Sequence, residues 1–300
     1  MSITEDIKNV FTRRDNALNQ LIVLNVLVFA VLVVVQAVMF ISSASDWFPA
    51  VLKQFQLNSD LSVLLRHPWT VLSYAFTHQG FLHILFNLLN LYWFGQLIRE
   101  YLGDRRLVSL YILGALAGAA VFLLSFNLIP VFKPGVGTPM IGASAAVTAI
   151  IVAAATLLPD YTFMLLLLGP VKIKWIAAVV VLISLAGING GNPGGEIAHL
   201  GGALLGFVFI KQLQAGRDLG TPVQAVGRWF GNLFNRRPTM RASSSRRPEP
   251  VTTTSSSGAA KKSANQPMQE EIDLILDKIS RSGYESLSKE EKQKLFRASQ

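Results

Sequence analysis

Four polar residues lie inside otherwise apolar stretches of this 300-residue chain. Ser144 lies in the stretch from 137 to 156, about one turn inside an expected helix. His199 lies in a second apolar stretch, and His83 and Asn87 share a third. A lone serine in such a helix most often bonds only to its own backbone. Polar groups are costly inside a membrane and indicate function by default, so the four residues need a joint explanation.

Nucleophilic catalysis is the chemistry that these residue types can perform together. A serine hydroxyl is a weak nucleophile until a neighbouring base takes its proton, and imidazole is the usual base near neutral pH. Acyl transfer also needs donors for the oxyanion, and the candidates are Asn87, His83 and the backbone N–H of Ser144. Small residues would let the two helices that carry Ser144 and His199 approach closely. They are Gly142, Ala143, Ala145 and Ala146 on one helix, and Gly201, Gly202 and Gly206 on the other.

The composition indicates a membrane protein with several spans rather than a soluble domain. Hydrophobic residues make up 51% of the chain and charged residues 15%, and the mean hydropathy is +0.42. Cysteine is absent, which excludes disulfides, a thiolate nucleophile and a thiolate metal site. We expect no metal and no cofactor. The uncharged stretch 16–45 is longer than the apolar part of a signal peptide, so we interpret it as an uncleaved first span.

The apolar stretches predict an all-α, polytopic membrane protein with six transmembrane helices. Five of the expected spans cover residues 21–41, 81–98, 107–126, 140–158 and 175–188, and the sixth starts near Glu196 and is short. Helical spacing of apolar residues in 42–80 predicts interfacial helices. Residues 161–174 are apolar but split by Gly169 and Pro170, which predicts a re-entrant or hairpin-like element. The glycine-rich loop 187–195 is expected to be mobile.

Lys and Arg gather in the N-terminal segment, after the second and fourth spans, and in the tail. The positive-inside rule then places both termini in the cytoplasm, and we expect a bacterial inner membrane. The second, fourth and sixth spans would all begin at the external face. Counting from these helix starts puts His83, Ser144 and His199 at a similar depth, roughly 3 to 6 Å. The predicted topology therefore brings the polar residues to one level.

At these residues the sequence resembles the rhomboid family of intramembrane serine proteases. HQGFLHILFN resembles the histidine and asparagine pattern of the family's second span. GASA is similar to its GxSG serine motif, and AHLGGALLG is similar to its HxxGxxxG motif. Together the motifs cover the core from about residue 65 to residue 210, and they are specific in combination.

The resemblance implies a six-helix rhomboid-like bundle that cleaves transmembrane or membrane-proximal segments of membrane proteins through an acyl-enzyme. It implies that Ser144 is the nucleophile and His199 the base, a dyad without an acid. It also implies that Asn87 and His83 are oxyanion donors. The small residues expected to support the motifs are Gly142, Ala145, Gly202 and Gly206.

Two residues depart from the family's pattern. Ala145 stands where the serine motif has glycine, which adds a methyl group where the helices are expected to be tightest. Thr70 follows Trp69 at a position where many members have arginine. Neither departure removes a catalytic atom.

The chain is expected to fall into four parts. They are a cytoplasmic N-terminal segment (1–20), the six-helix intramembrane protease domain (21–213), a basic juxtamembrane segment with a disordered linker (214–267), and a small helical hairpin (268–300). In the helical hairpin, Ser288 and Glu291 are spaced as a capping box at the start of a helix.

The tail suggests partners for the chain. Residues 211–300 carry 16 Lys and Arg against 9 Asp and Glu, so we expect contact with anionic lipid. Thr221 and Pro222 can start a short interfacial helix. The terminal hairpin would bind an unknown cytoplasmic partner. No nucleic-acid partner is expected, because no recognisable fold or aromatic platform accompanies the charge.

Several alternatives stay open. The main one is a proteolytically inactive rhomboid-like membrane scaffold that binds client transmembrane helices; it would have lost Ser144 or His199, and both are present. An intramembrane metalloprotease would need an HExxH motif, which does not occur. An aspartyl protease would need two buried acids, whereas Asp104 and Asp160 lie at span ends. A transporter would need polar groups near the bilayer midplane, and here they are shallow.

Overall fold

The computed structural model of the chain describes Val10, residues 16–165 and 169–234, and nine positions between 274 and 294. It divides into two units, Met1–Pro238 and Thr239–Gln300, which we treat separately. Residues 1–9 and 11–15 of the expected N-terminal segment, and residues 235–267 of the expected juxtamembrane segment and linker, lie outside the described residues.

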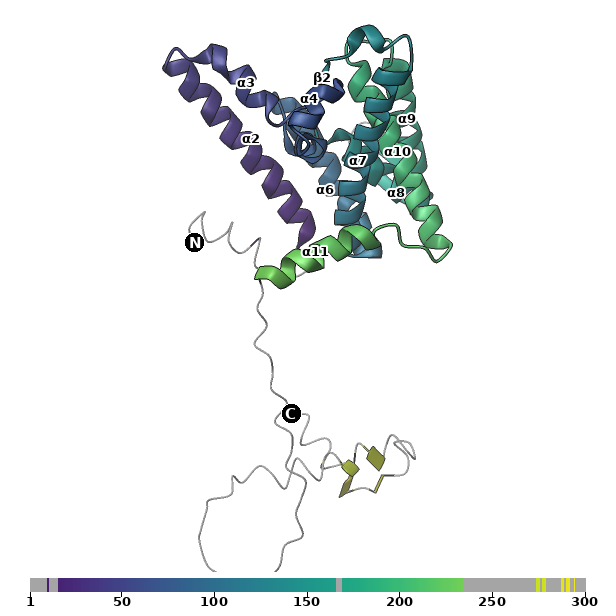
Figure 1. Cartoon of the computed structure of the whole chain (residues 1–300). Coiled ribbons are helices and arrows are strands. Elements are labelled where there is room, and N and C mark those ends of the chain that lie inside the picture. The colour runs from purple at the N-terminus through teal and green to yellow at the C-terminus, as the bar shows by residue number, and fades with distance from the viewer. Residues whose placement is uncertain are drawn as a thin grey trace, which may run out of the picture. The chain divides into compact units, whose positions relative to one another are not determined.

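The first unit is mostly helical (Figure 1). Its long helices are α2 (Ala17–Ile41), α6 (Phe81–Leu102), α7 (Asp104–Leu128), α8 (Ser144–Leu157), α9 (Ile173–Gly187), α10 (Pro193–Gln214) and α11 (Thr221–Phe234). Short helices fill the connection between α2 and α6, as the sequence predicts: η1 (Ser45–Trp47), α3 (Phe48–Lys53), α4 (Leu61–Arg66), α5 (Thr70–Ser73) and η2 (Tyr74–Phe76). Another 3₁₀ turn, η3 (Lys133–Gly135), follows α7.

Two small antiparallel sheets accompany the helices. The first pairs β1 (Leu57–Asn58) with β2 (Pro139–Met140), which the sequence does not predict. The second pairs β3 (Thr162–Leu165) with β4 (Gly169–Lys172), which confirms a hairpin in residues 161–174. Lys174 and Lys172 each contact Asp160 Oδ1 at 2.9 Å, and their hydrogen bonds lower the pKa of this carboxyl to about 2.

Among the described residues, four helices are long and apolar enough to cross a membrane: α2, α6, α7 and α10. The chain is therefore a multi-pass membrane protein. The helices α8 and α9 are apolar but have only 14 and 15 residues, against the roughly 20 that a bilayer requires. A count of six membrane-spanning helices stays a prediction.

Five of the six helices begin two to four residues away from the predicted span starts, and the shifts of α8 and α10 affect the candidate site. Ser144 is the first residue of α8, so the prediction that it lies one turn inside the helix is wrong; residues 139 and 140 pair with β1 instead. Helix α10 begins at Pro193, three residues before the predicted start, and is not short. Asn192 explains this earlier start, because its Oδ1 accepts a hydrogen bond from the Gly195 N–H (3.1 Å) and caps the helix. Proline at the first helical position adds a suitable φ angle.

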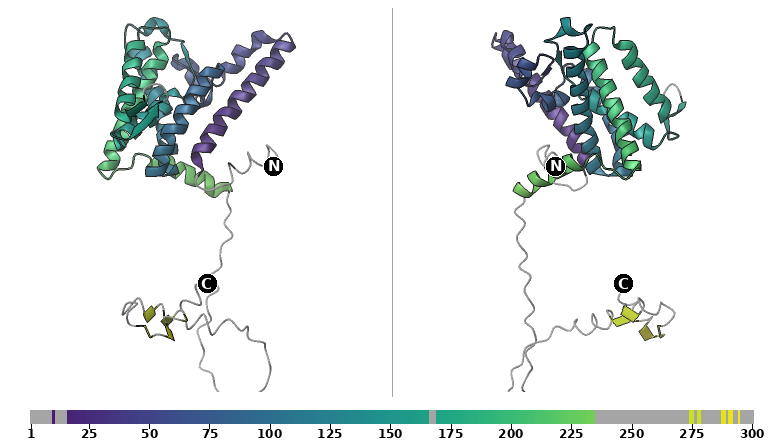
Figure 2. Two further views of the ribbon diagram at one scale, coloured as in Figure 1. Left: turned by 180° about the vertical axis from the view of Figure 1, so that it is seen from behind. Right: turned by 45° about the vertical axis from the view of Figure 1, so that its right-hand side comes forward.

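The core of the unit is the close packing of α10 on α8 and α7 (Figures 1 and 2). Glycine spacing explains how the backbones approach so closely. A Cβ added to Gly202 would collide with the Ala145 carbonyl oxygen of α8, and one added to Gly206 would collide with the Ala149 carbonyl oxygen. These two glycines are one helical turn apart, so they form a single flat stripe against α8.

The methyl group of Ala145, the first departure from the family's pattern, has a complementary partner on α7. Ala145 is almost fully buried, and its Cβ lies 2.5 Å from the place that a Cβ on Gly118 would occupy. A similar relation holds one turn along, where Gly114 faces the Ala149 Cβ. The glycines of α7 therefore provide the space that alanine in α8 fills.

Helix α2 is attached to the bundle near its start and leans away from it toward α3 (Figures 1 and 2). Its anchor is a buried polar contact, in which Asn25 Nδ2 donates to the Tyr111 hydroxyl of α7 at 3.1 Å. Residues Val33, Val34 and Val38 further along are largely exposed. Apolar side chains on this part of α2 therefore face the surroundings, as expected for a helix in lipid.

Helix α11 confirms the short helix predicted from Thr221 and Pro222, and it lies across the end of the bundle at which α2 begins (Figure 1). The connection from α10 is tied to α7 by an ion pair between Arg106 and Asp218 (3.0 Å). Val226 and Trp229 of α11 are more than half exposed. This exposed apolar face suits an interfacial helix.

In the second unit, the described residues confirm the capping box. The Ser288 N–H donates to Glu291 Oε2 at 2.7 Å, and the Glu291 N–H donates to the Ser288 hydroxyl at 3.3 Å. Lys278 Nζ contacts the same carboxylate at 2.9 Å. Leu274, Ile275, Asp277 and Lys278 are helical, and most of the other residues of the expected hairpin lie outside the described part of the chain.

The glycine stripe of α10 leads to a stability prediction. Gly202→Ala should destabilise the protein by about 1–3 kcal/mol, because the new methyl group meets backbone that no side-chain rotation can move. Thermal unfolding of the purified full chain in detergent measures this loss. The matched control is Gly227→Ala in α11, where a Cβ has no neighbour within 4 Å. An unchanged melting temperature for Gly202→Ala would contradict the packing described here.

Candidate active site

The four polar residues predicted from the sequence line one cavity of about 410 Å³ between α6, α8, α9 and α10. We refer to it as the Ser144 cavity. Each helix contributes polar side chains at its wall: His83 and Asn87 from α6, Ser144 from α8, Ser184 from α9, and Glu196 and His199 from α10. Asn90 of α6, Thr148 of α8 and apolar residues of α6, α8 and α9 complete the lining.

Ser144 occupies the first position of α8, which affects its backbone as much as its side chain. The first helical bond recorded for α8 runs from the Val147 N–H to the Ala143 carbonyl at 2.9 Å. The N–H of Ser144 thus lies in the first turn, where a helix offers no carbonyl partner. The positive end of the helix dipole is at the same place. Both features favour a developing negative charge beside Ser144.

The two residues before Ser144 are held by the segment that precedes α6. The Gly142 N–H donates to the Tyr74 carbonyl at 2.9 Å, and the Ala143 N–H donates to His78 Nε2 at 3.3 Å. Tyr74 is itself fixed on α7, because its buried hydroxyl donates to the Ala115 carbonyl at 2.7 Å. The start of α8 is therefore positioned by residues about 65 positions earlier in the chain.

Gly142 is required at its position for two reasons. Its φ of +119° is in the region that residues with a side chain avoid. A Cβ there would also lie 2.7 Å from His83 Nε2 and 3.6 Å from Ser144 Oγ. The absence of a side chain at Gly142 leaves open the space that His83 and Ser144 share.

Asn87 has a hydrogen-bond donor available for the cavity. Its Nδ2 donates to the His83 carbonyl one turn earlier at 2.8 Å, which fixes the amide on the surface of α6. An amide group has two N–H donors, so one remains after this bond. Asn87 is buried, and a second donor in this place is available to a ligand oxygen.

His199 is held through its Nδ1 atom. Glu196 Oε2 lies 3.2 Å from Nδ1, and the hydroxyl of Ser184 lies 3.1 Å from it. An ionised carboxylate only accepts, so this contact requires the proton on Nδ1 and leaves Nε2 with its lone pair. No hydrogen bond between Ser144 and His199 is recorded among the described residues. Catalytic bonds are often long before substrate binds, so this geometry does not exclude the pair.

The equal depths predicted from the helix starts do not occur in the structure. His83 is the third residue of α6 as predicted, but Ser144 is the first residue of α8 and His199 is the seventh of α10. Equal distances from the helix starts are therefore not what brings these residues together. The contact of Gly202 with the Ala145 carbonyl is the cause, because His199 lies one turn before Gly202 on the same face.

Sequence reasoning missed four polar residues of this cavity: Asn90, Thr148, Ser184 and Glu196. Glu196 carried a signal, since it lies three residues before His199 and therefore on the same face of the helix. Ser184 carried no signal in the sequence, because its place depends on how α9 packs.

Thr70, the second departure from the family's pattern, is buried and its hydroxyl donates to the His67 carbonyl at 2.7 Å.

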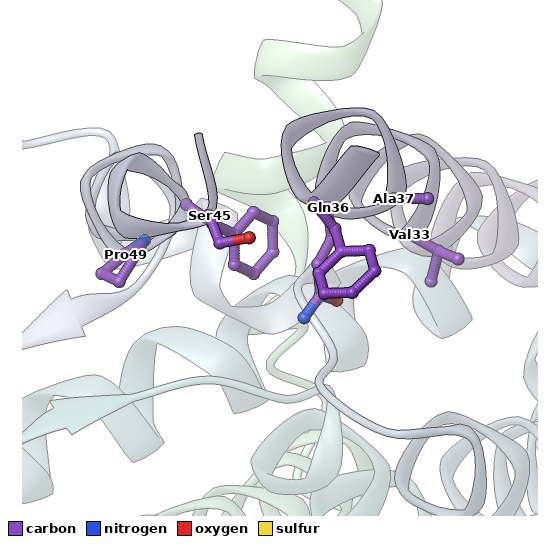
Figure 3. Close-up of a pocket in the computed structure, with 7 residues that line it drawn as sticks. Val33, Gln36, Ala37, Ser45 and Pro49 are labelled. Atoms are coloured by element: carbon purple, nitrogen blue, oxygen red, sulfur yellow. The ribbon is translucent and has the colours of Figure 1, made fainter. Parts of the chain in front are cut away.

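A larger cavity of about 550 Å³ lies between α2 and the segment that contains η1 and α3 (Figure 3). Its polar groups are the amide of Gln36 and the hydroxyl of Ser45, and the rest of its lining is apolar. It contains neither a base nor an ionisable side chain. The chemistry of the described residues therefore points to the Ser144 cavity despite its smaller volume.

The fold and the cavity define a multi-pass membrane protein with a serine and a histidine on two tightly packed helices. A sequence model of the rhomboid domain matches residues 65–214, which is half of the chain, and the chain therefore belongs to the rhomboid family. Residues 262–300 match a second model, a family of unknown function (DUF6576).

Similar proteins come from plants and yeast. RHOMBOID-like protein 12, mitochondrial, of Arabidopsis thaliana is 32% identical over 158 residues, 49% of this chain and 47% of that protein. Rhomboid protein 1, mitochondrial, of Saccharomyces cerevisiae is 28% identical over 54% of this chain and 47% of its own length. Rhomboid-like protein 16, chloroplastic, of Arabidopsis thaliana is 29% identical over 55% of each chain. The chain spans about half the length of the curated relatives it matches.

Proposed function

We propose that this protein is an intramembrane serine endopeptidase that cleaves transmembrane or membrane-proximal segments of membrane proteins. The observation that carries the proposal is the Ser144 cavity, which is lined by a serine at a helix start and by a histidine whose Nδ1 is already engaged. Engagement of Nδ1 leaves Nε2 to act as the base toward Ser144. Membership of the rhomboid family supports the same reading.

The reaction would proceed through an acyl-enzyme. Ser144 Oγ attacks the carbonyl carbon of a peptide bond, and its proton passes to His199 Nε2. When the C–N bond breaks, the proton on Nε2 passes to the leaving amine, and the acyl group stays on Ser144 as an ester. Water then attacks the ester and gives its proton to Nε2. The carboxylic acid leaves as that proton returns to Ser144 Oγ.

Three groups can stabilise the oxyanion that forms in each attack. The Ser144 N–H lies at the start of α8, Asn87 has a second amide N–H, and His83 Nε2 faces the space beside Gly142. Donors that point to the place where charge develops are worth more in a site shielded from water. We assign these three groups as the oxyanion hole.

A transmembrane segment can reach this cavity from the lipid side. The flanks of the cavity carry large apolar side chains that are mostly exposed: Leu82 (64%) and Phe86 (60%) on α6, and Ile183 (62%) on α9. Helix α9 is at the edge of the bundle (Figure 2), so a substrate could enter between it and α6. An apolar entrance beside a polar centre suits a substrate that is itself a membrane segment.

The alternative function is an inactive rhomboid-like scaffold that binds client transmembrane helices. The names of RHOMBOID-like protein 12 and Rhomboid-like protein 16 state a likeness to the family and no activity. A scaffold would use the same apolar entrance but would not need a reactive serine. The two functions therefore differ in the reactivity of Ser144.

We further propose that both termini face the cytoplasmic side, since Lys and Arg gather on that side of the predicted topology. The basic tail would contact anionic lipid, and the terminal hairpin would bind a cytoplasmic partner. The relatives named above are mitochondrial or chloroplastic, and these names give no support to the expected bacterial inner membrane. We therefore propose the orientation of the two termini and do not assign the chain to a particular membrane.

The reactivity of Ser144 decides between protease and scaffold. A fluorophosphonate probe should label the wild-type protein at Ser144, because a serine reacts only when a base activates it. Ser144→Ala should abolish labelling and cleavage of a transmembrane substrate, and His199→Ala should slow labelling by roughly 10³-fold or more. Mass spectrometry of the labelled protein identifies the site. Ser42→Ala, at an exposed serine, is the matched control and should keep full labelling. Folded wild-type protein that neither reacts nor cleaves would favour the scaffold.

The role of Asn87 can be tested against a neighbouring asparagine. Asn87→Ala should lower kcat by about 10² to 10³ with a folded protein, because an oxyanion donor is lost. Asn90 makes the same kind of bond to its own helix, from Nδ2 to the Phe86 carbonyl at 2.8 Å, and it lines the same cavity, but we assign it no oxyanion role. Asn90→Ala should therefore cost less than about tenfold. Equal losses in the two variants would assign Asn87 a packing role.

The proposed orientation can be measured because the chain has no native cysteine. Gly191→Cys introduces a thiol in the loop before α10, where a Cβ has no neighbour within 4 Å. A membrane-impermeant maleimide should label this cysteine from the side opposite to the termini. A cysteine placed at Ser42, next to the end of α2, serves as the control for the same side. Labelling of Gly191→Cys only from the side of the termini would overturn the orientation.

A further inference from the structure

We infer that Glu196 is a positioning residue for His199, so that the reactive group is a Ser144–His199–Glu196 arrangement rather than a dyad without an acid. The inference deepens the proposed protease function and rests on it for its catalytic consequence. Glu196 would hold the proton on Nδ1 and stabilise the imidazolium that forms when Nε2 takes the proton of Ser144. The carboxylate itself would not accept that proton.

The geometry of α10 supports this assignment. Glu196 Oε2 lies 3.2 Å from His199 Nδ1, and the two side chains are three residues apart on one helix face. Each side chain is only 21% exposed. A carboxylate in the membrane region is costly unless it has a partner, and His199 is the partner recorded for Glu196 among the described residues.

A helix-capping role does not explain the position of Glu196. The cap of α10 is Asn192, whose Oδ1 accepts from the Gly195 N–H. The recorded side-chain bond of Glu196 goes to the imidazole of His199 instead. The carboxylate benefits from the dipole at the helix start, but its direction is set by the histidine.

Helix α9 keeps the carboxylate in this direction. A Cβ added to Gly187, the last residue of α9, would lie 2.9 Å from Glu196 Cδ and Cγ, so the glutamate side chain packs directly on that backbone. Three residues earlier, Ser184 contributes its hydroxyl to Nδ1 at 3.1 Å. Both Nδ1 partners are therefore fixed by the packing of α9 against α10.

The groups that face His199 determine how its charge can respond to pH. Glu196 lies on its own helix, and the imidazole of His83 faces it from α6. From α8 and α9 the polar side chains that line the cavity are the neutral hydroxyls of Ser144, Thr148 and Ser184. Among the described residues that line the cavity, Glu196 is the one acid. It is therefore the group that can balance an imidazolium.

The catalytic test compares Glu196→Gln with wild type in the purified full chain. The isosteric amide keeps the size but loses the charge, so kcat and the rate of fluorophosphonate labelling should fall by roughly 10- to 1,000-fold with KM unchanged. The acid limb of the pH–rate profile should move to lower pH, and Glu196→Asp should restore part of the rate. Glu100→Gln, at an exposed glutamate, is the matched control. Wild-type kcat and an unmoved profile in Glu196→Gln would overturn the inference.

A second readout does not depend on activity. The chain has four histidines, so ¹⁵N-histidine NMR can be assigned with a His199→Gln variant. In wild type the proton of neutral His199 should be on Nδ1, and in Glu196→Leu it should shift to Nε2, because the carboxylate acceptor is gone and the Ser184 hydroxyl can then donate to Nδ1. If wild type is inert but this shift occurs, the positioning contact stands and the protease function fails. If wild type is active and the tautomer does not depend on Glu196, the positioning role of Glu196 is wrong and the protease function stands.

Discussion

The close contact between α8 and α10 is the constraint on which the rest of the structure depends. Gly202 and Gly206 place one helix backbone against the carbonyl groups of Ala145 and Ala149 on the other. No apolar driving force pulls helices together in lipid, so small residues that permit close approach decide where helices pack. His199 is one turn from Gly202, and Ser144 is next to Ala145. The same contact that builds the core therefore sets the distance between the serine and the histidine.

That contact would be insufficient if the start of α8 could move. The backbone bonds from Gly142 and Ala143 to Tyr74 and His78 fix the two residues before Ser144. Tyr74 is in turn fixed on α7, the third helix of the core. The polar side chains of the cavity therefore belong to rigid elements. The serine is at the start of a helix, where the first N–H groups have no carbonyl partner within the helix. A site built this way needs little rearrangement when charge develops.

The sequence predicted the helices well because long apolar runs have few alternatives to a helix in a membrane. It predicted the wrong starts for α8 and α10 because short-range signals competed there. The glycines at 194 and 195 indicated a loop, yet Asn192 and Pro193 already begin the helix. The pairing of β2 with β1 depends on residues 57 and 58, about 80 positions away, and no local sequence pattern predicts it. Glu196 was overlooked for a different reason: its spacing from His199 was a signal, but a charge at an expected span end needs no explanation.

The polar groups of the cavity favour the protease over the scaffold. Hydrogen bonds within the cavity reduce the cost of keeping Asn87, His199 and Glu196 in the membrane, but they do not use every donor and acceptor. In the described part of the chain, the second N–H of Asn87, the N–H of Ser144 and Nε2 of His199 have no recorded hydrogen bond. A scaffold for apolar helices would gain nothing from these groups, because a client helix has its own backbone bonds satisfied. They become favourable only when a peptide carbonyl enters the cavity and acquires charge, which is the event that a protease must stabilise.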